Sequence, residues 1–419
     1  MKFCLGMTRT HLGCAATMLS LSISLPAQAA GFNFTQISDS ANSPFRIFRN
    51  AAINNQGLVS FETFVSPQAP PIAVSAGSGG SITPISDPNG PYNVTFYSSL
   101  NNTGTATFTG NLVDLSKIDP NGGPPTDPTA TLLKSGIYAN TGGVVKTIAD
   151  STSKEFNFFG SSAINDAGTI AFFASFGAGE SGIFSSSNGK VTPVVSTLGE
   201  FSSFVGGIDT VGGDGPFAIY TIPGINNSGK IAFSATLDTG KSGVFVSDGG
   251  TVKTIVSSKF NRFSSAAIND QGTVAFVGEL IGGDRGIFTG TEKGLKTIAD
   301  TSGAFSLFTS DPALNNNGEV AFLAELDNGG KGIFNGADPI ANKVIAVGDF
   351  LNGLSVLDLT IIDKGLNDSG QIGFGVLLSD GSERIFRAKP VPEPGSVAGL
   401  AAVGLIGGWL KRHRRKSVA

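Results

Sequence analysis

The chain has 419 residues, with 28 Lys and Arg, 32 Asp and Glu, and two His. Both Cys and all three Met lie in the first 29 residues, and the His and Trp residues lie in the two end segments, so residues 30–394 contain no Cys, His, Met or Trp. This composition excludes disulfides, Ser-His-Asp catalysis and Cys-His catalysis from the body of the chain, and it argues against zinc or copper sites.

The charge of the body excludes a further class of partner. Seven of the 28 basic residues lie in the end segments, which leaves 21 basic against 32 acidic residues and a formal charge of −11. Nucleic acid requires a basic surface, so we expect no nucleic-acid partner, and no residue pattern indicates a cofactor. Many Gly and Phe residues and a low charged fraction are typical of a β-rich extracellular body.

Residues 1–29 are predicted to be a cleaved signal peptide. Lys2 and Arg9 provide positive charge, and residues 12–25 form an apolar run that is too short to span a membrane. Ala27-Gln28-Ala29 then matches the small-x-small pattern of a cleavage site. An uncleaved anchor is the alternative, which Pro26 disfavours because it interrupts the apolar run.

Residues 30–389 contain seven copies of one motif, which reads AINDAGTIAF at 163–172 and recurs at intervals of 43–64 residues. Its Asn can bond local backbone and its Gly can adopt positive φ, so each copy predicts a turn between two strands. The motif is similar to that of the NxxGxxAF tandem-repeat proteins, which implies a surface location and no defined enzyme activity. The predicted turn residues are Asn54 and Gly57, Asn101 and Gly104, Asn165 and Gly168, Asn226 and Gly229, Asn269 and Gly272, Asn315 and Gly318, and Asn367 and Gly370.

The surroundings of the motif predict an all-β, seven-bladed β-propeller. Most copies follow a Phe-x-x-Phe pair and precede a Gly-Ile/Val-aromatic segment and a fourth segment such as VKTIAD, which makes four strands per unit of about 45 residues. The seventh copy ends at 383–388 without its fourth segment, whereas residues 32–48 resemble 145–159. We therefore expect strand 34–38 to dock on the last blade and close the ring. An open β-solenoid or several β-sandwiches are the alternatives.

Departures from the repeat are the candidate functional positions. Three insertions, at 66–91, 114–131 and 205–223, are either binding loops or tolerated additions. Asp209 and Asp214 in the third are candidate ligands. Glu279 and Glu325 occupy equivalent places in neighbouring repeats, where they are either paired carboxylates or solvated rim residues. The turn residues Asp166, Asp270 and Asp368 lack the dense spacing of a calcium loop, so we interpret them as turn formers and expect no metal.

Residues 390–419 form a three-part C-terminal tail. Pro392-Glu393-Pro394 precedes an apolar run at 397–410, which predicts a short transmembrane helix that stops translocation with its basic end in the cytoplasm. This order resembles the PEP-CTERM sorting signal, which implies cleavage near the motif by an exosortase. An ordinary membrane anchor is the alternative. The basic residues are Lys411, Arg412, Arg414, Arg415 and Lys416.

Together these features favour an exported surface protein without enzymatic activity. It would be held in the membrane by the C-terminal helix and then reside at the cell surface or outside the cell. Its propeller would bind extracellular polysaccharide or another surface protein, or serve as a structural component of the matrix. The alternative is a polysaccharide-acting hydrolase or lyase that uses carboxylates at the mouth of the propeller.

Overall fold

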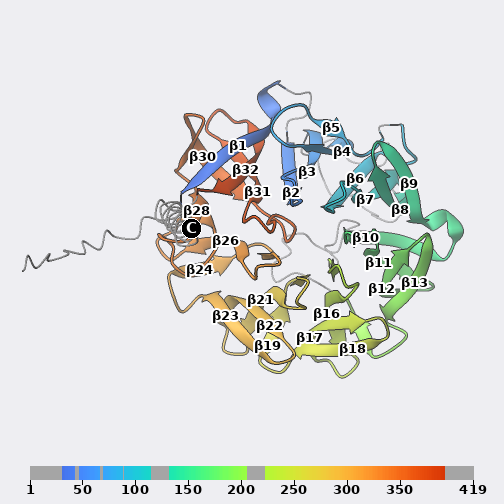
Figure 1. Cartoon of the computed structure of the whole chain (residues 1–419). Coiled ribbons are helices and arrows are strands. Elements are labelled where there is room, and N and C mark those ends of the chain that lie inside the picture. Colours follow the sequence, from blue (N-terminus) through green and yellow to red (C-terminus); the bar gives the residue numbers. More distant parts are fainter. Residues whose placement is uncertain are drawn as a thin grey trace, which may run out of the picture.

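The computed structural model describes residues 31–42, 47–66, 69–87, 89–114, 132–204 and 222–391. These residues form an all-β, seven-bladed propeller, in which short sheets surround a central axis (Figure 1). Among the described residues, no helix has the length and apolar character needed to cross a membrane. The predicted signal peptide, the sorting motif with its basic tail, and Asp209 and Asp214 lie outside the described residues.

The first four blades follow one another along the chain, each starting at the axis and ending at the rim. Blade 1 contains β2 (Ile47–Ile53), β3 (Val59–Ser66), β4 (Ala69–Gly77) and β5 (Thr83–Pro84); blade 2 contains β6 (Val94–Leu100), β7 (Ala106–Val113), β8 (Leu132–Thr141) and β9 (Val144–Asp150); blade 3 contains β10 (Phe156–Ile164), β11 (Ile170–Phe176), β12 (Glu180–Ser187) and β13 (Lys190–Ser196); and blade 4 contains β14 (Phe201–Ser203), β15 (Gly224–Ile225), β16 (Ile231–Leu237), β17 (Ser242–Asp248) and β18 (Thr251–Val256).

The last three blades complete the circle. Blade 5 contains β19 (Phe260–Phe263), β20 (Ala267–Ile268), β21 (Val274–Leu280), β22 (Arg285–Thr291) and β23 (Gly294–Asp300); blade 6 contains β24 (Phe305–Phe308), β25 (Ala313–Leu314), β26 (Val320–Leu326), β27 (Lys331–Phe334) and β28 (Lys343–Ala346); and blade 7 contains β29 (Phe350–Leu351), β30 (Leu354–Thr360), β31 (Ile372–Leu378), β32 (Glu383–Pro390) and the N-terminal strand β1 (Phe32–Asp39).

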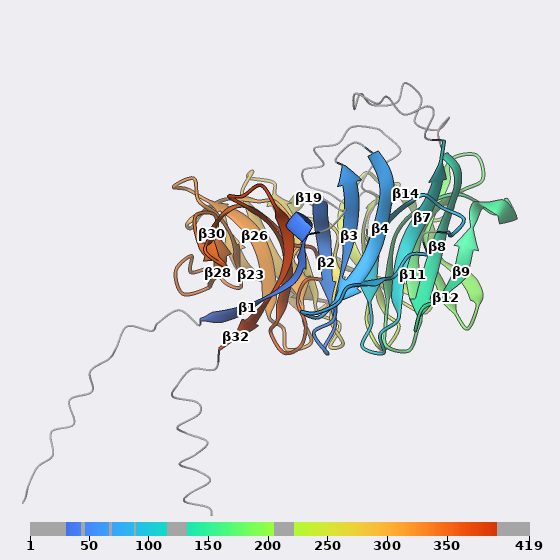
Figure 2. The ribbon, with the colours of Figure 1, turned by 90° about the horizontal axis from the view of Figure 1, so that it is seen from above.

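The N-terminal strand closes the ring on the last blade. β1 pairs antiparallel with β32 from Phe32↔Pro390 to Asp39↔Arg384, and Arg384 also contacts the Asp39 carboxylate at 3.3 Å. Beyond the strands, the Val391 N–H donates to the Gly31 carbonyl at 2.8 Å. This pairing confirms the expected docking of residues 34–38, and the two ends of the body lie side by side (Figure 2).

The blades pack through both faces of their sheets. Along β11, Ile170 to Ala174 are all buried, with exposed fractions of 0–3%, so successive residues that point to opposite faces are both covered. Within a blade, four Phe side chains form edge-to-face, tilted and stacked pairs; in blade 5, Phe288 meets Phe260 edge to face with ring centroids 5.0 Å apart and stacks on Phe276 at 5.8 Å. The equivalent sets are Phe156, Phe159, Phe172 and Phe184; Phe201, Phe204, Phe233 and Phe245; and Phe305, Phe308, Phe322 and Phe334.

The recurrent Gly of the Gly-Ile/Val-aromatic segment is required by a bulge between the third and fourth strands. In blade 5 the register shifts between Ile287 and Phe288. A Cβ built on the preceding residue, Gly286, would lie only 2.8 Å from the Ala299 carbonyl oxygen of β23. The backbone of the outer strand therefore approaches too closely for any side chain at this position.

The prediction that residues 66–91 form an insertion is wrong. This segment supplies β4 and β5, the third and fourth strands of blade 1. Val74 and Ala76 point into the core with exposed fractions of 0% and 3%, an alternation that the surrounding Pro, Gly and Ser residues obscure in the sequence. A parallel bridge between Ile72 and Val94 also joins blades 1 and 2 into one continuous sheet.

Candidate functional site: two rings of turns at the axis

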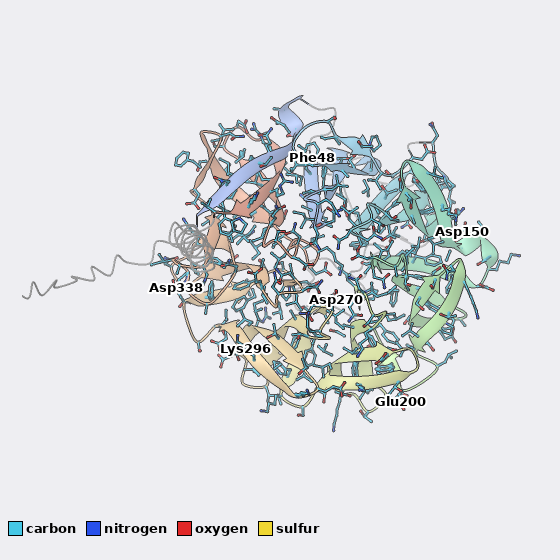
Figure 3. The ribbon with its side chains drawn as sticks, in the orientation of Figure 1. Phe48, Asp150, Glu200, Asp270, Lys296 and Asp338 are labelled. Atoms are coloured by element: carbon cyan, nitrogen blue, oxygen red, sulfur yellow. The ribbon has the colours of Figure 1, made fainter. Side chains whose placement is uncertain are left out.

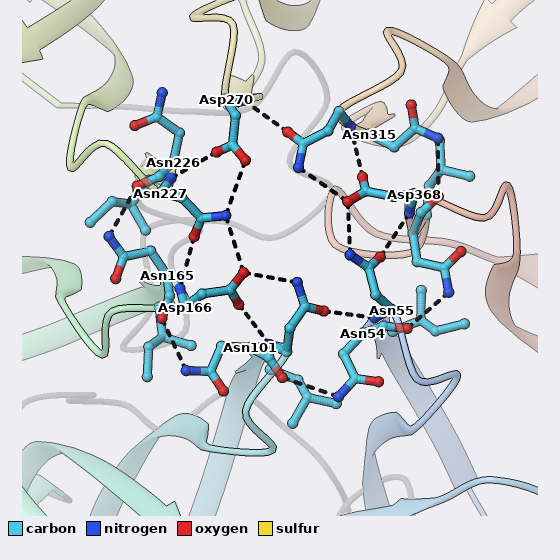
Figure 4. A pocket seen from close by; sticks show the side chains of 18 of the residues that line it. Asn54, Asn55, Asn101, Asn165, Asp166, Asn226, Asn227, Asp270, Asn315 and Asp368 are labelled. Atoms are coloured by element: carbon cyan, nitrogen blue, oxygen red, sulfur yellow. Dashed lines mark hydrogen bonds between the residues drawn. The ribbon is translucent and has the colours of Figure 1, made fainter.

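The seven motif turns converge at one end of the central axis (Figure 4). Each turn joins the innermost strand of a blade to the second strand, and its Gly adopts φ between +69° and +84°. The side chains of the turns line an axial cavity of about 150 Å³. We call this end of the propeller the turn face.

The first Asn of each turn belongs to an inner ring that runs through all seven blades. Each Nδ2 group donates to the backbone carbonyl of the equivalent Asn in the next blade, at 2.8–3.2 Å. All seven side chains are buried, with exposed fractions of 3–5%. The ring runs from Asn54 through Asn101, Asn165, Asn226, Asn269, Asn315 and Asn367 back to Asn54.

The oxygen of each inner-ring amide bonds its own turn. Asn226 Oδ1, for example, accepts the Lys230 N–H at 2.9 Å, and Asn269 Oδ1 accepts the Thr273 N–H at 2.9 Å. One side chain therefore satisfies the backbone of its own turn and that of the next blade. Asn meets this need because its amide carries both donors and an acceptor, whereas an ionised Asp only accepts.

The second residue of each turn forms an outer ring. Its backbone N–H donates to the Oδ1 atom of the equivalent side chain in the next blade, at 2.8–2.9 Å in every case. The members, in order, are Asn55, Asn102, Asp166, Asn227, Asp270, Asn316 and Asp368. Figure 3 shows Asp270 near the centre of the propeller, whereas Asp150, Glu200, Lys296 and Asp338 lie toward the rim of the propeller.

Amide and carboxylate side chains alternate around the outer ring. Asn227 donates from Nδ2 to Oδ2 atoms on both sides, at 3.1 Å to Asp166 and 3.0 Å to Asp270. Asp368 likewise accepts from Asn55 at 2.7 Å and from Asn316 at 3.1 Å. Because seven is odd, strict alternation must fail once, and it fails at Asn55 and Asn102, which places no two carboxylates side by side.

The end of the chain is also attached to these turns. Arg387 of β32 donates from Nη1 to the Gly57 carbonyl of blade 1 at 2.6 Å. The positive φ of 77° at Gly57 favours glycine, and a Cβ there would displace the Arg387 guanidinium from this position. The last strand therefore bridges the junction between blades 7 and 1.

Two further carboxylates lie on or beside the inner strands. Glu62 is 2% exposed, and its Oε1 accepts the Tyr97 N–H of blade 2 at 2.7 Å. Burial raises the pKa of Glu62 to about 7, against hydrogen bonds from Asn50 and Tyr97 that lower it. Burial and the charge of Asp363 likewise raise the pKa of Asp311 to about 7.

The other candidate carboxylates are placed separately. Glu279 lies opposite Arg285 on the neighbouring strand and forms an ion pair with it at 3.1 Å. Glu325 occupies the same place in blade 6, opposite Lys331. Within the part of the chain that the structure describes, no group of three or more His, Cys, Asp or Glu residues is placed to hold a metal ion.

The two rings hold neighbouring blades together at the turn face. Their hydrogen bonds connect each turn to the next. The inner ring is buried, and hydrogen bonds away from water are stronger and polarise one another. The interpretation of Asp166, Asp270 and Asp368 as turn formers missed these contacts between blades. The available signal was that only Asn and Asp occupy the second turn position in all seven copies, although a turn alone tolerates other residues.

The comparisons with known proteins identify a family and a sorting motif. A model described as a family of unknown function, DUF7453, matches residues 92–398, and the PEP-CTERM protein-sorting motif matches residues 390–415. The first match begins just before blade 2 and covers blades 2 to 7, except for the N-terminal strand β1. No curated protein sequence matches the chain.

Three solved structures show a distant likeness to the chain. One match, from an analysis of two prolyl endopeptidases, has 10% identity and a TM-score of 0.48 and covers 84% of this chain; the chain spans 51% of that protein. A protein of unknown function from Dyadobacter fermentans has 12% identity, a TM-score of 0.40 and coverage of 88% and 100%. YCF48 from Cyanidioschyzon merolae has 14% identity, a TM-score of 0.43 and coverage of 86% and 100%.

Proposed function

Because the chain belongs to the DUF7453 family, whose function is unknown, and carries a PEP-CTERM motif, we propose that it is an exported propeller sorted by an exosortase. The body acts at the cell surface or in the extracellular matrix, as a non-enzymatic binding or structural component. The C-terminal helix holds it in the membrane until the tail is processed.

One observation carries this proposal: the sorting motif begins at the last residue of the final strand, β32. The motif match starts at Pro390, which is the last residue of β32 and is paired with Phe32. Cleavage at Pro392-Glu393-Pro394 therefore separates the tail without removing any strand of the propeller. A sorting signal in this position can be removed without disturbing the propeller.

The two rings support a scaffold rather than a catalytic centre at the turn face. Active-site groups must be available to bond a substrate. The amides and carboxylates at this face instead form hydrogen bonds with one another and with the turn backbone. Glu279 is held by Arg285 in an ion pair. Extracellular polysaccharide or another surface protein is the partner we propose for the remaining surface.

The sorting proposal is tested by changing the motif in a host that contains an exosortase. The double substitution Pro392→Ala and Pro394→Ala should leave a longer, membrane-bound chain, whereas the wild type should appear at the surface or in the medium without its tail. Pro193→Ala is the matched control, because Pro193 is an exposed proline in the outer strand β13. Identical size and location of all three proteins would refute sorting through this motif.

The binding role requires a separate measurement. The purified body should be retained by the exopolysaccharide of its host or should capture a surface protein from it. A chain that binds neither, although it is sorted correctly, would leave only the structural role. If the wild type cleaves the polysaccharide and the Glu279→Gln and Glu325→Gln double variant does not, this result would instead support the hydrolase or lyase alternative.

A further inference from the structure

The geometry of the two ends points to a fixed orientation of the propeller above a membrane. We propose that, while the tail is inserted, the turn face lies toward the lipid surface and the opposite face is presented outward. This inference rests on the proposed membrane-anchored, sorted form of the protein. It adds which surface of the body faces the bilayer and which is available to partners.

The first step is that the chain leaves the body at the turn face. β32 runs toward the motif turns, since Arg387 bonds the Gly57 carbonyl and a Cβ on Gly370 would lie 3.2 Å from the Pro390 side chain. Gly57 and Gly370 belong to the turns of blades 1 and 7. β1 starts at the same place, because the Gly31 carbonyl bonds the Val391 N–H (Figure 2).

The second step concerns reach. The apolar run begins at Val397, six residues after Val391, which is bonded to Gly31 and is the last residue that the structure describes. Six residues span at most about 20 Å when fully extended. The eight residues of β32 already measure about 26 Å at roughly 3.3 Å per residue. The connection is therefore too short to run back along a blade and bring the opposite face to the membrane.

The third step identifies what the opposite face carries. β7 runs away from the turn at Gly104, and the chain returns in β8. The predicted insertion at 114–131 therefore leaves and re-enters the body at the face that we predict to point outward. The turns between the second and third strands, such as residues 177–179 of blade 3, lie at this same end.

The absence of Cys from residues 30–394 allows a direct test with single-cysteine variants of the full chain. Ala167→Cys and Ala178→Cys form a matched pair, because both alanines are exposed and lie in the turns at either end of β11. The seven residues of β11 separate these turns by about 23 Å. Ser228→Cys and Thr239→Cys provide a second pair at the two ends of β16 in blade 4.

Each variant, with Cys4 and Cys14 replaced by Ser, is labelled with a fluorescent donor. It is then reconstituted into phosphatidylethanolamine and phosphatidylglycerol vesicles that carry an acceptor on the lipid headgroup. We expect roughly two-fold or greater loss of donor emission at 167 relative to 178, and at 228 relative to 239, because transfer falls steeply over a 23 Å difference in height. The same vesicles without acceptor provide the baseline.

The outcomes separate this inference from the proposed function. Equal or reversed quenching within both pairs, in a chain that floats with the vesicles, would overturn the orientation and leave membrane anchoring intact. A chain that does not float with the vesicles would overturn the anchoring itself. Insertion of about twenty Gly and Ser residues after Val391 should abolish the difference, because a flexible linker of this length no longer restricts the body.

Discussion

At the residue scale, Asn and Asp at the axis are not interchangeable, although both form turns. The inner ring uses Asn in all seven blades because each side chain must donate to a carbonyl and accept from an N–H. The outer ring uses both residue types because its backbone bonds require only the Oδ1 atom. Its second polar atom is then free to donate or accept, which permits alternation.

The arrangement of the outer ring predicts a charge swap that moves its single break in alternation. Asn55→Asp should place two carboxylates together at the contact with Asp368 and lower the free energy of unfolding by about 1–3 kcal/mol at neutral pH. Adding Asp368→Asn should restore most of this loss, because the ring then alternates again and the like pair becomes Asn316 with residue 368.

Urea unfolding of the wild type, both single variants and the double variant measures this coupling as a double-mutant cycle. Simple additivity of the two single effects would show that the side-chain contacts around the outer ring carry no energy. Below about pH 4 the Asn55→Asp variant should recover stability, since protonation of one carboxylate removes the repulsion.

Glu62 predicts a dependence of stability on pH. Its pKa is raised from 4.5 to about 7 by burial, so the folded protein holds a proton that the unfolded chain releases. The stabilisation is complete below pH 4.5 and is lost as the pH rises through about 7, which corresponds to about 3 kcal/mol. Asp311, with a pKa also raised to about 7, adds to the same trend.

The measurement is thermal unfolding at pH 5 and pH 8 in Glu62→Gln and in the wild type. We expect the variant to lose less stability across this interval, because its side chain stays neutral and still accepts the Tyr97 N–H. Glu200→Gln, at the exposed rim of the molecule (Figure 3), is the control and should behave like the wild type. A wild type that is more stable at pH 8 than at pH 5 would contradict the assignment.

At the element scale, β1 is the strand that closes the ring of blades. It covers the edge of β32, and Phe34 packs edge to face on Phe374 at 6.1 Å. Deletion of residues 32–39 should destabilise blade 7 and expose the β32 edge, which promotes association between chains. We expect a lower unfolding temperature together with dimers or larger species in solution.

A peptide of the sequence FNFTQISD should reverse these effects in trans, because an exposed strand edge accepts a complementary strand. A scrambled peptide of the same composition is the control. Rescue by the scrambled peptide, or a deletion variant that is as stable and monomeric as the wild type, would show that β1 is dispensable for ring closure.

At the scale of the whole molecule, the fold is largely predictable from the sequence, and the two rings of hydrogen bonds at the turn face are not. Periodicity predicted the blades, and the unmatched segment at 32–48 predicted closure by the N-terminal strand, because these features depend on local patterns. The contacts between Asn226 and Asn269, or Asn227 and Asp270, depend on how neighbouring blades face each other. A single repeat carries no record of that geometry. The strand β4 is not predictable from the sequence for a different reason, since Pro and Gly flank its alternating core residues.

The body predicts a sharp difference between two truncations. Removal of residues 392–419 should change the free energy of unfolding by less than about 0.5 kcal/mol, because every strand and the bond from Val391 to Gly31 remain. Truncation after Ser382 removes β32 and should abolish cooperative unfolding, since blade 7 loses the strand between β31 and β1. Calorimetry of both truncated chains tests the comparison, and similar transitions in the two would refute it.

The pairing of β1 with β32 also has a consequence in time. Roughly 350 residues separate these partners, so a ribosome adding 5–20 residues per second needs about 20–70 s to deliver the second strand after the first. During this interval the earliest strand of the body has no partner and the circle is open. The chain completes its fold only when its final strand emerges, immediately ahead of the segment that marks it for sorting. Synthesis of the sorting motif and closure of the propeller therefore follow each other almost immediately in every molecule.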